Sequence, residues 1–238
     1  MVFFLNLSYL VSGLFVICKI NTTMNQTYTK QFESLTLYNQ PLFETDNFKV
    51  VPSLGSLVEG WLLIVPKKHY LSFGYLEKNL FNELSLLHNF VVNSLESIYN
   101  KGVISFENGT FNHGSCIGCG VDYAHIHYVP IEVDIKQLID EFYNFSINWE
   151  KANSLLSLKN PIENHAPYIF IENNYRERFI CEITTPHSQL IRKLIAKQIG
   201  MPEKYDWKKY FFEENIKKTI EKFEVYSSIK QMKEFQFA

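Results

Sequence analysis

The longest regular pattern of apolar residues along the chain lies between Leu80 and Tyr99. Apolar side chains recur there every three or four positions, with polar residues such as Asn82, Glu83 and Asn89 between them. This 3.6-residue period predicts an amphipathic helix of about five turns.

Shorter apolar runs on both sides of this helix predict strands. They are rich in β-branched and aromatic residues, and turn-forming residues bound them. The predicted strands are residues 48–52, 61–66, 103–107 and 124–133. Two strands, one long helix and two more strands predict an α+β fold, in which the helix packs across a largely antiparallel sheet.

A second section of regular structure begins near Asp134. The pattern predicts a helix over 137–145 and a β-hairpin of 168–172 with 178–183, turning at Asn173-Asn174. Two helices close the chain, the first over 188–199 with Ser188 as its cap and Gly200 as its stop. We therefore expect a domain over residues 24–145 and an α/β extension over residues 146–238 that packs against it.

The N-terminal segment, residues 1–23, is open to three interpretations. Residues 2–18 are apolar except for Asn6, Ser8, Ser12 and Gly13, which fits a signal sequence or an anchor. The run lacks a basic start and is short for a hydrocarbon core of roughly 30 Å. The segment could instead precede a true start at Met24, or form part of the domain.

Composition limits the class of protein. The chain has 238 residues, of which 46% are hydrophobic and 20% charged, so it can bury a core and is not a disordered protein. The net charge is -2 without a long basic run, so long nucleic acid is not an expected partner. Four cysteines in a chain of this size favour a reduced, cytoplasmic location, although the apolar residues 2–18 argue the other way.

The candidate chemistry centres on His125 and His127. Residues two apart on a strand point to the same face, about 6.6–6.8 Å apart, so both imidazoles project together. Two adjacent imidazoles can flank one phosphate group. The H-x-H pattern alone fits a pair of ordinary buried histidines equally well.

Three segments together resemble the histidine triad family. Residues 120–130 (GVDYAHIHYVP) are similar to its signature H-φ-H-φ-H-φ-φ, on a strand after a glycine-rich loop. Residues 58–69 (VEGWLLIVPKKH) are similar to its G-H-x-L-(I/V)-x-P-K-x-H segment, and residues 106–109 to its strand-then-glycine approach. The resemblance covers about residues 38–135. It implies a nucleotidyl hydrolase or transferase that cleaves a dinucleoside polyphosphate, nucleotidyl sugar or similar nucleotide at its α-phosphate, and a possible homodimer.

The resemblance also implies roles for individual residues. His127, taken as the middle histidine, would be the nucleophile, and His125 would orient the phosphate. A shorter C-terminal resemblance, over 186–192 and 205–207, is to histidine-triad-like proteins related to RNA debranching and splicing factors. The expected substrate contacts are Ser53, Glu107, Asn108, His113, Gly114, Ser115, Gly118, Gly120 and Gln189.

Two positions depart from the family pattern. Val129 stands where this alignment puts the third histidine, and Trp61 stands where the G-H segment has its histidine. Neither side chain transfers a proton, so another group such as His113 or His69 would serve the leaving group, or the leaving group would need no help. The alternative function is a non-catalytic module that binds nucleotides or RNA ends.

Cys116 and Cys119 raise the possibility of a zinc site. With His125 and His127 they form a Cys₂His₂ set of ligand types. A zinc-bound His127 could not attack phosphorus, so the two models exclude each other. We expect Cys119 to be a packing residue, and hence no metal and no cofactor.

Overall fold

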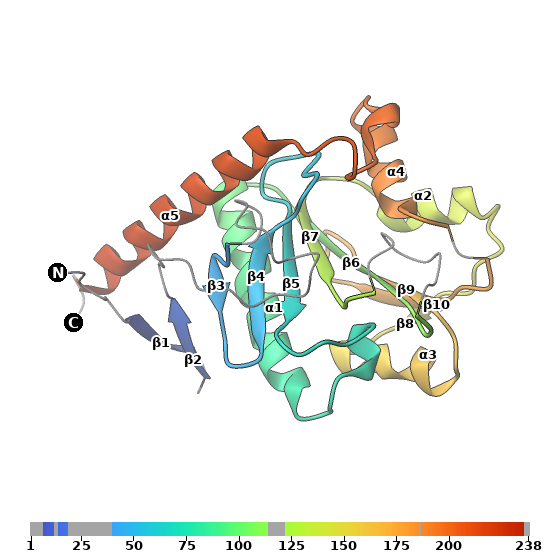
Figure 1. Cartoon of the computed structure of the whole chain (residues 1–238), viewed down its shortest axis with the longest axis horizontal. Coiled ribbons are helices and arrows are strands. Elements are labelled where there is room, and N and C mark those ends of the chain that lie inside the picture. Colours follow the sequence, from blue (N-terminus) through green and yellow to red (C-terminus); the bar gives the residue numbers. More distant parts are fainter. Residues whose placement is uncertain (1–6, 12–13, 19–39, 114–121, 186, 236–238) are drawn as a thin grey trace.

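The computed structural model describes residues 7–11, 14–18, 40–113, 122–185 and 187–235. Within these residues the chain forms a ten-stranded antiparallel sheet in the order β1-β2-β3-β4-β5-β7-β6-β9-β10-β8 (Figure 1). The strands are β1 (Leu7–Val11), β2 (Leu14–Cys18), β3 (Phe43–Glu44), β4 (Phe48–Pro52), β5 (Leu62–Pro66), β6 (Val103–Gly109), β7 (Ile126–Pro130), β8 (Glu150–Lys151), β9 (Tyr168–Glu172) and β10 (Arg178–Glu182).

Helices cover both faces of this sheet. The helices are α1 (Leu80–Tyr99), α2 (Ile135–Phe142), α3 (Lys159–Glu163), α4 (Leu190–Gln198) and α5 (Glu213–Phe235), with short 3₁₀ turns at Phe73–Tyr75, Leu155–Leu158 and Pro202–Lys204. The predicted α+β fold is confirmed. The bounds predicted for α1, β4 and β9 are also those of the structure.

One core lies between α1 and the sheet. The apolar stripe of α1, which includes Leu84, Leu87 and Val91, packs on Ile64 and Ile126 of the sheet. These side chains are fully buried, and each contributes roughly 1.5–3 kcal/mol by leaving water. In Figure 1, α1 crosses behind the sheet.

A second core lies on the opposite face, where α2 and α4 pack. Ile139 of α2 and Ile195 of α4 meet Phe106 and Val129 from the sheet. Alternation along β7 divides its residues between the two cores. Ile126 and Tyr128 join the α1 core, while Val129 joins the core under α2 and α4.

The C-terminal section is built into the same sheet. β9 pairs with β6 from Ser105↔Glu172 to Gly109↔Tyr168, so the sheet continues across the boundary at residue 146. The sequence led us to expect an extension that packs against the domain of residues 24–145, and the structure adds that the two share one sheet. Pairing is favoured because it satisfies the backbone N–H and C=O groups of β6 and buries all five residues of β9.

The N-terminal segment forms a strand pair in its described part. β1 pairs with β2, and β2 meets β3 at Ile17↔Glu44. At the other end of the chain, α5 is anchored where Thr219 accepts a hydrogen bond from Gly60 N–H at 2.8 Å. Throughout the described residues, no helix has both the length and the apolar composition needed to cross a membrane.

Candidate functional site

The two histidines lie side by side near the middle of the sheet. β7 runs between β5 and β6, with His127 opposite Leu63 on one side and Phe106 on the other. His125 immediately precedes β7. The ring centroids of His125 and His127 are 4.8 Å apart, and the ring planes meet at 74°. The adjacency that the spacing predicts is therefore present, on the face away from α1.

Aromatic rings enclose His127. Its ring stacks on Phe106 at 4.4 Å, and the edge of Trp61 meets it at 5.8 Å. The Arg192 guanidinium lies over the ring of Trp61, 4.7 Å from its centroid. His127 is 3% exposed and Arg192 2% exposed. Arg192, Trp61 and His127 thus form a buried column that links α4 to β7.

The hydrogen bond of His125 fixes its tautomer. Its Nδ1 lies 2.7 Å from the Tyr123 carbonyl oxygen. A carbonyl can only accept, so Nδ1 carries the proton and donates it. In the neutral ring, Nε2 then carries the lone pair. His125 therefore presents a nucleophilic nitrogen.

His127 has the opposite arrangement. Trp61 Nε1 lies 3.0 Å from His127 Nδ1. An indole N–H can only donate, so Nδ1 is an acceptor and Nε2 carries the proton of the neutral ring. His127 Nε2 is buried and has no hydrogen-bond partner among the described residues. Its N–H is therefore a donor that a ligand could satisfy.

The surroundings keep both rings neutral. Burial lowers the pKa of His125, the Tyr123 carbonyl opposes this, and the Arg192 charge adds to it. Burial, followed by the charges of His125 and Arg192, holds the pKa of His127 well below its ordinary value. Near pH 7 the site thus offers one lone pair beside one N–H donor.

The sequence was compared with protein-family models and with curated proteins. No family model and no curated protein matches the sequence. The resemblance to the histidine triad family consequently stays a prediction from the motifs.

Glu107 does not join the histidines. It points to the α1 face, where one carboxylate oxygen accepts from Phe73 N–H at 2.8 Å and the other bonds the Tyr168 hydroxyl at 2.5 Å. The structure therefore does not bring Glu107 to the histidines, because alternation along β6 puts Phe106 on the histidine face and its neighbour on the other. Asn108 returns to the histidine face, where it pairs with Ile169 of β9.

The buried Glu107 gives a prediction about stability. Burial raises its pKa from 4.5 to about 7, against the opposing bonds from Tyr168 and Phe73. The folded state then holds the proton more tightly than the unfolded state, so the free energy of unfolding falls as pH rises from about 4.5 to 7. The expected loss is about 3 kcal/mol. Urea unfolding at several pH values would measure the free energy of unfolding of the wild type and of Glu107→Gln. The fall between about pH 4.5 and pH 7 should be smaller in Glu107→Gln, and an equal fall in both proteins would refute the prediction.

The remaining predicted contacts are placed elsewhere or lie outside the described residues. Ser53 is buried and donates to the Leu54 carbonyl at 3.2 Å. The side chain of Gln189 bonds Asp206 at 3.1 Å, and its left-handed backbone forms the cap of α4 in place of Ser188. Gly114, Ser115, Gly118 and Gly120 lie outside the described residues, as do Cys116 and Cys119.

His113 lies at the surface. Its side chain is 73% exposed, and its Nδ1 is 3.5 Å from a carboxylate oxygen of Asp122. Its ring is parallel to that of His69 at 6.3 Å, and His69 Nε2 lies 2.6 Å from the Asp122 carbonyl oxygen. These three residues form a surface cluster of their own.

Two residues of the site were missed by sequence reasoning. Trp61 was read only as a lost histidine, whereas its N–H orients His127. Arg192 entered the sequence analysis only as the last residue of the C-terminal resemblance over 186–192, whereas it stacks on Trp61 and donates to the carbonyls of Gly55 and Tyr205. For both residues the signal in the sequence is Trp61, which stands where the family has a histidine. A large buried aromatic side chain needs a neighbour that packs on its ring, and Arg192 is that neighbour.

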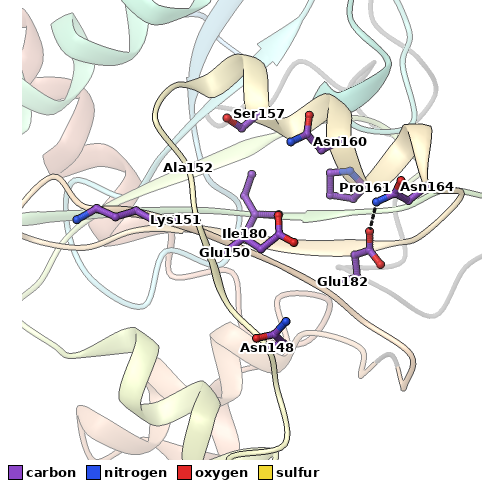
Figure 2. A pocket seen from close by; sticks show the side chains of 10 residues that line it. All are labelled: Asn148, Glu150, Lys151, Ala152, Ser157, Asn160, Pro161, Asn164, Ile180 and Glu182. Carbon is purple, nitrogen blue, oxygen red and sulfur yellow. Dashed lines mark hydrogen bonds between the residues drawn. The ribbon is translucent and has the colours of Figure 1, made fainter.

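A separate hollow lies between α3 and the β8–β10 edge (Figure 2). It is lined by polar side chains, among them Asn148, Glu150 and Asn160, and Asn164 donates to Glu182 there at 2.8 Å. Two strands, β9 and β10, separate β8 from β6, and the histidines lie farther along the sheet, at the start of β7 and immediately before it. The hollow is therefore distinct from the histidine site.

Proposed function

We propose that this protein is a nucleotidyl hydrolase or transferase in which His125 attacks the α-phosphate of a nucleotide-type substrate. The observation that carries the proposal is the complementary pair of tautomers: a lone pair on His125 Nε2 beside an N–H on His127 Nε2. A phosphate needs both, because its phosphorus accepts a nucleophile while its oxygens accept hydrogen bonds.

The reaction proceeds in two displacements. His125 Nε2 forms a bond to phosphorus, and the bond from phosphorus to the leaving oxygen breaks with its electron pair on that oxygen. The ring becomes cationic, and its Nδ1–H still donates to the Tyr123 carbonyl. Water or another acceptor then attacks phosphorus, releases a proton to solvent, and returns the electron pair to Nε2. His127 Nε2–H stabilises the charge on a phosphate oxygen in both steps.

This assignment moves the nucleophile from His127 to His125. Trp61 occupies the Nδ1 lone pair of His127, and its Nε2 carries a proton, so His127 has no lone pair to offer. The family signature can also be aligned two residues earlier, with Tyr123, His125 and His127 at its three histidine positions. Val129, which is fully buried under α2 and α4, then falls on one of the apolar positions that end the signature.

The same alignment makes Tyr123 the substituted position. Its hydroxyl donates to the Pro66 carbonyl at 2.5 Å, so it is engaged in holding the strands together. His127 would have to become an anion to release its proton, and so it acts as a hydrogen-bond donor and not as a general acid. The site consequently suits leaving groups that are stable as anions.

Substrate preference tests this consequence. Phosphoanhydrides should be cleaved about 10² to 10⁴ times faster than phosphoramidates of simple amines, the factor that general acid help typically supplies. Steady-state rates on a matched pair with the same nucleoside would measure it. Equal rates on both would contradict the assignment of His127 as a donor only. Tight binding without turnover on any phosphoanhydride would favour the binding-module alternative.

A further inference from the structure

Trp61 holds the ring of His127 in one orientation through its N–H. It immediately precedes β5, is fully buried, and donates its N–H to His127 Nδ1 at 3.0 Å. Arg192 lies over its ring at 4.7 Å, and Phe106 meets it edge-on at 6.1 Å. The indole is held on several sides, so its N–H cannot turn away from His127 without repacking the core.

We infer that Trp61 is a positioning residue that sets substrate specificity, by locking His127 as a neutral Nε2–H donor and so denying the site a general acid. The inference deepens the proposed function and rests on it for its effect on substrates. Protonation of His127 would put a second N–H on Nδ1, directly facing the Trp61 N–H. Two donors at 3.0 Å repel each other, and neither could be satisfied in this buried position.

Among the described residues, the groups that face His127 all disfavour a positive charge on its ring. His125 on the same strand and Arg192 on α4 are cationic or can become so. Phe106 on β6 and Trp61 are uncharged, and the ring stacks on Phe106 at 4.4 Å. Burial and these charges oppose a positive ring, while the indole N–H removes the acceptor that such a ring would need.

The consequence concerns the leaving group. A histidine that can hold two protons is able to pass one to a poor leaving group such as an amine. A histidine that is held with a single proton can donate a hydrogen bond to a phosphate oxygen, but it cannot give that proton away. Trp61 thus restricts the site to substrates whose leaving group departs as an anion, and Arg192 supports this restriction by holding the indole in place.

The test compares the whole chain with its Trp61→His variant by nitrogen NMR of the imidazole rings. In the wild type, His127 should show the Nε2–H tautomer with no titration around the ordinary histidine pKa of about 6.5. An imidazole at position 61 can accept a hydrogen bond, so in Trp61→His the ring of His127 should titrate around that value. Trp149→His is the matched control, since Trp149 donates to Asp140 beside α2 at 2.6 Å, and it should leave His127 unchanged.

Kinetics supply a second readout. At about pH 5.5 the ratio of phosphoramidate to phosphoanhydride cleavage should rise at least about tenfold in Trp61→His and stay constant in Trp149→His. Titration of His127 in the wild type, or a proton on its Nδ1, would overturn the inference even if the variant fails to fold. An unchanged, non-titrating His127 in a folded Trp61→His protein would do the same. If no nucleotide is turned over, the proposed reaction fails while the NMR result still decides the role of Trp61.

Discussion

His125→Ala should lower turnover of nucleotide substrates by at least about 10⁴-fold, because it removes the nitrogen that bonds to phosphorus in the first displacement of the proposed reaction. His127→Ala should cost less, about 10² to 10³, since it removes one donor to a phosphate oxygen. Single-turnover kinetics with a phosphoanhydride substrate would measure both losses. The ordering of the two variants separates the roles more clearly than either value alone.

Two controls make this comparison decisive. Glu107→Gln changes a buried residue on the α1 face, away from the histidines, and should keep normal turnover near neutral pH. His127→Ala should still accumulate a covalent adduct, although slowly, whereas His125→Ala should form none. The reverse ordering, with His127→Ala the more damaging variant and no adduct on it, would return the nucleophile to His127.

His88→Leu should lower the free energy of unfolding by about 3 kcal/mol. His88 lies on α1 without exposure to solvent, with Nδ1 2.9 Å from the Tyr128 hydroxyl and Nε2 3.0 Å from a Glu172 carboxylate oxygen. Leucine fills similar space but leaves that hydroxyl and part of that carboxylate without a partner. Glu172 keeps its bond to Arg178, which limits the loss.

Urea unfolding at constant pH would measure this effect. His113→Leu is the matched control, because the same substitution at a surface histidine should change the free energy of unfolding by less than about 0.5 kcal/mol. A similar small change in His88→Leu would show that the buried network with Glu172 contributes nothing to stability.

The elements with strong local patterns were predictable from the sequence. α1 has twenty residues of regular apolar spacing, and the bounds of the hairpin of β9 and β10 are marked by Asn173 and by β-branched and aromatic runs. The two-residue strands β3 and β8 were not predicted, because two residues carry no periodicity. The pairing of β9 with β6 joins segments some sixty residues apart, and such pairings depend on which edges remain free.

The site was predictable in its position but not in its chemistry. Spacing alone brings His125 and His127 to one face. The spacing does not show which ring nitrogen carries the proton. That depends on the backbone carbonyl of Tyr123 and on the indole of Trp61, which is distant in the sequence but contacts His127 in the fold. Glu107 was misplaced for a related reason. Phe106, the residue before Glu107, pairs with His127. Only the strand register shows that Phe106, and not Glu107, faces the site.

The most direct measurement is the position of the covalent adduct. The protein would be mixed with a nucleoside phosphoanhydride and quenched in alkali, where a bond from histidine nitrogen to phosphorus survives. The peptide carrying both histidines would then be fragmented in a mass spectrometer. We expect a nucleotidyl group on His125 of the wild type and of His127→Ala, and none on His125→Ala. A nucleotidyl group on His127, or turnover that passes through no adduct, would contradict the account.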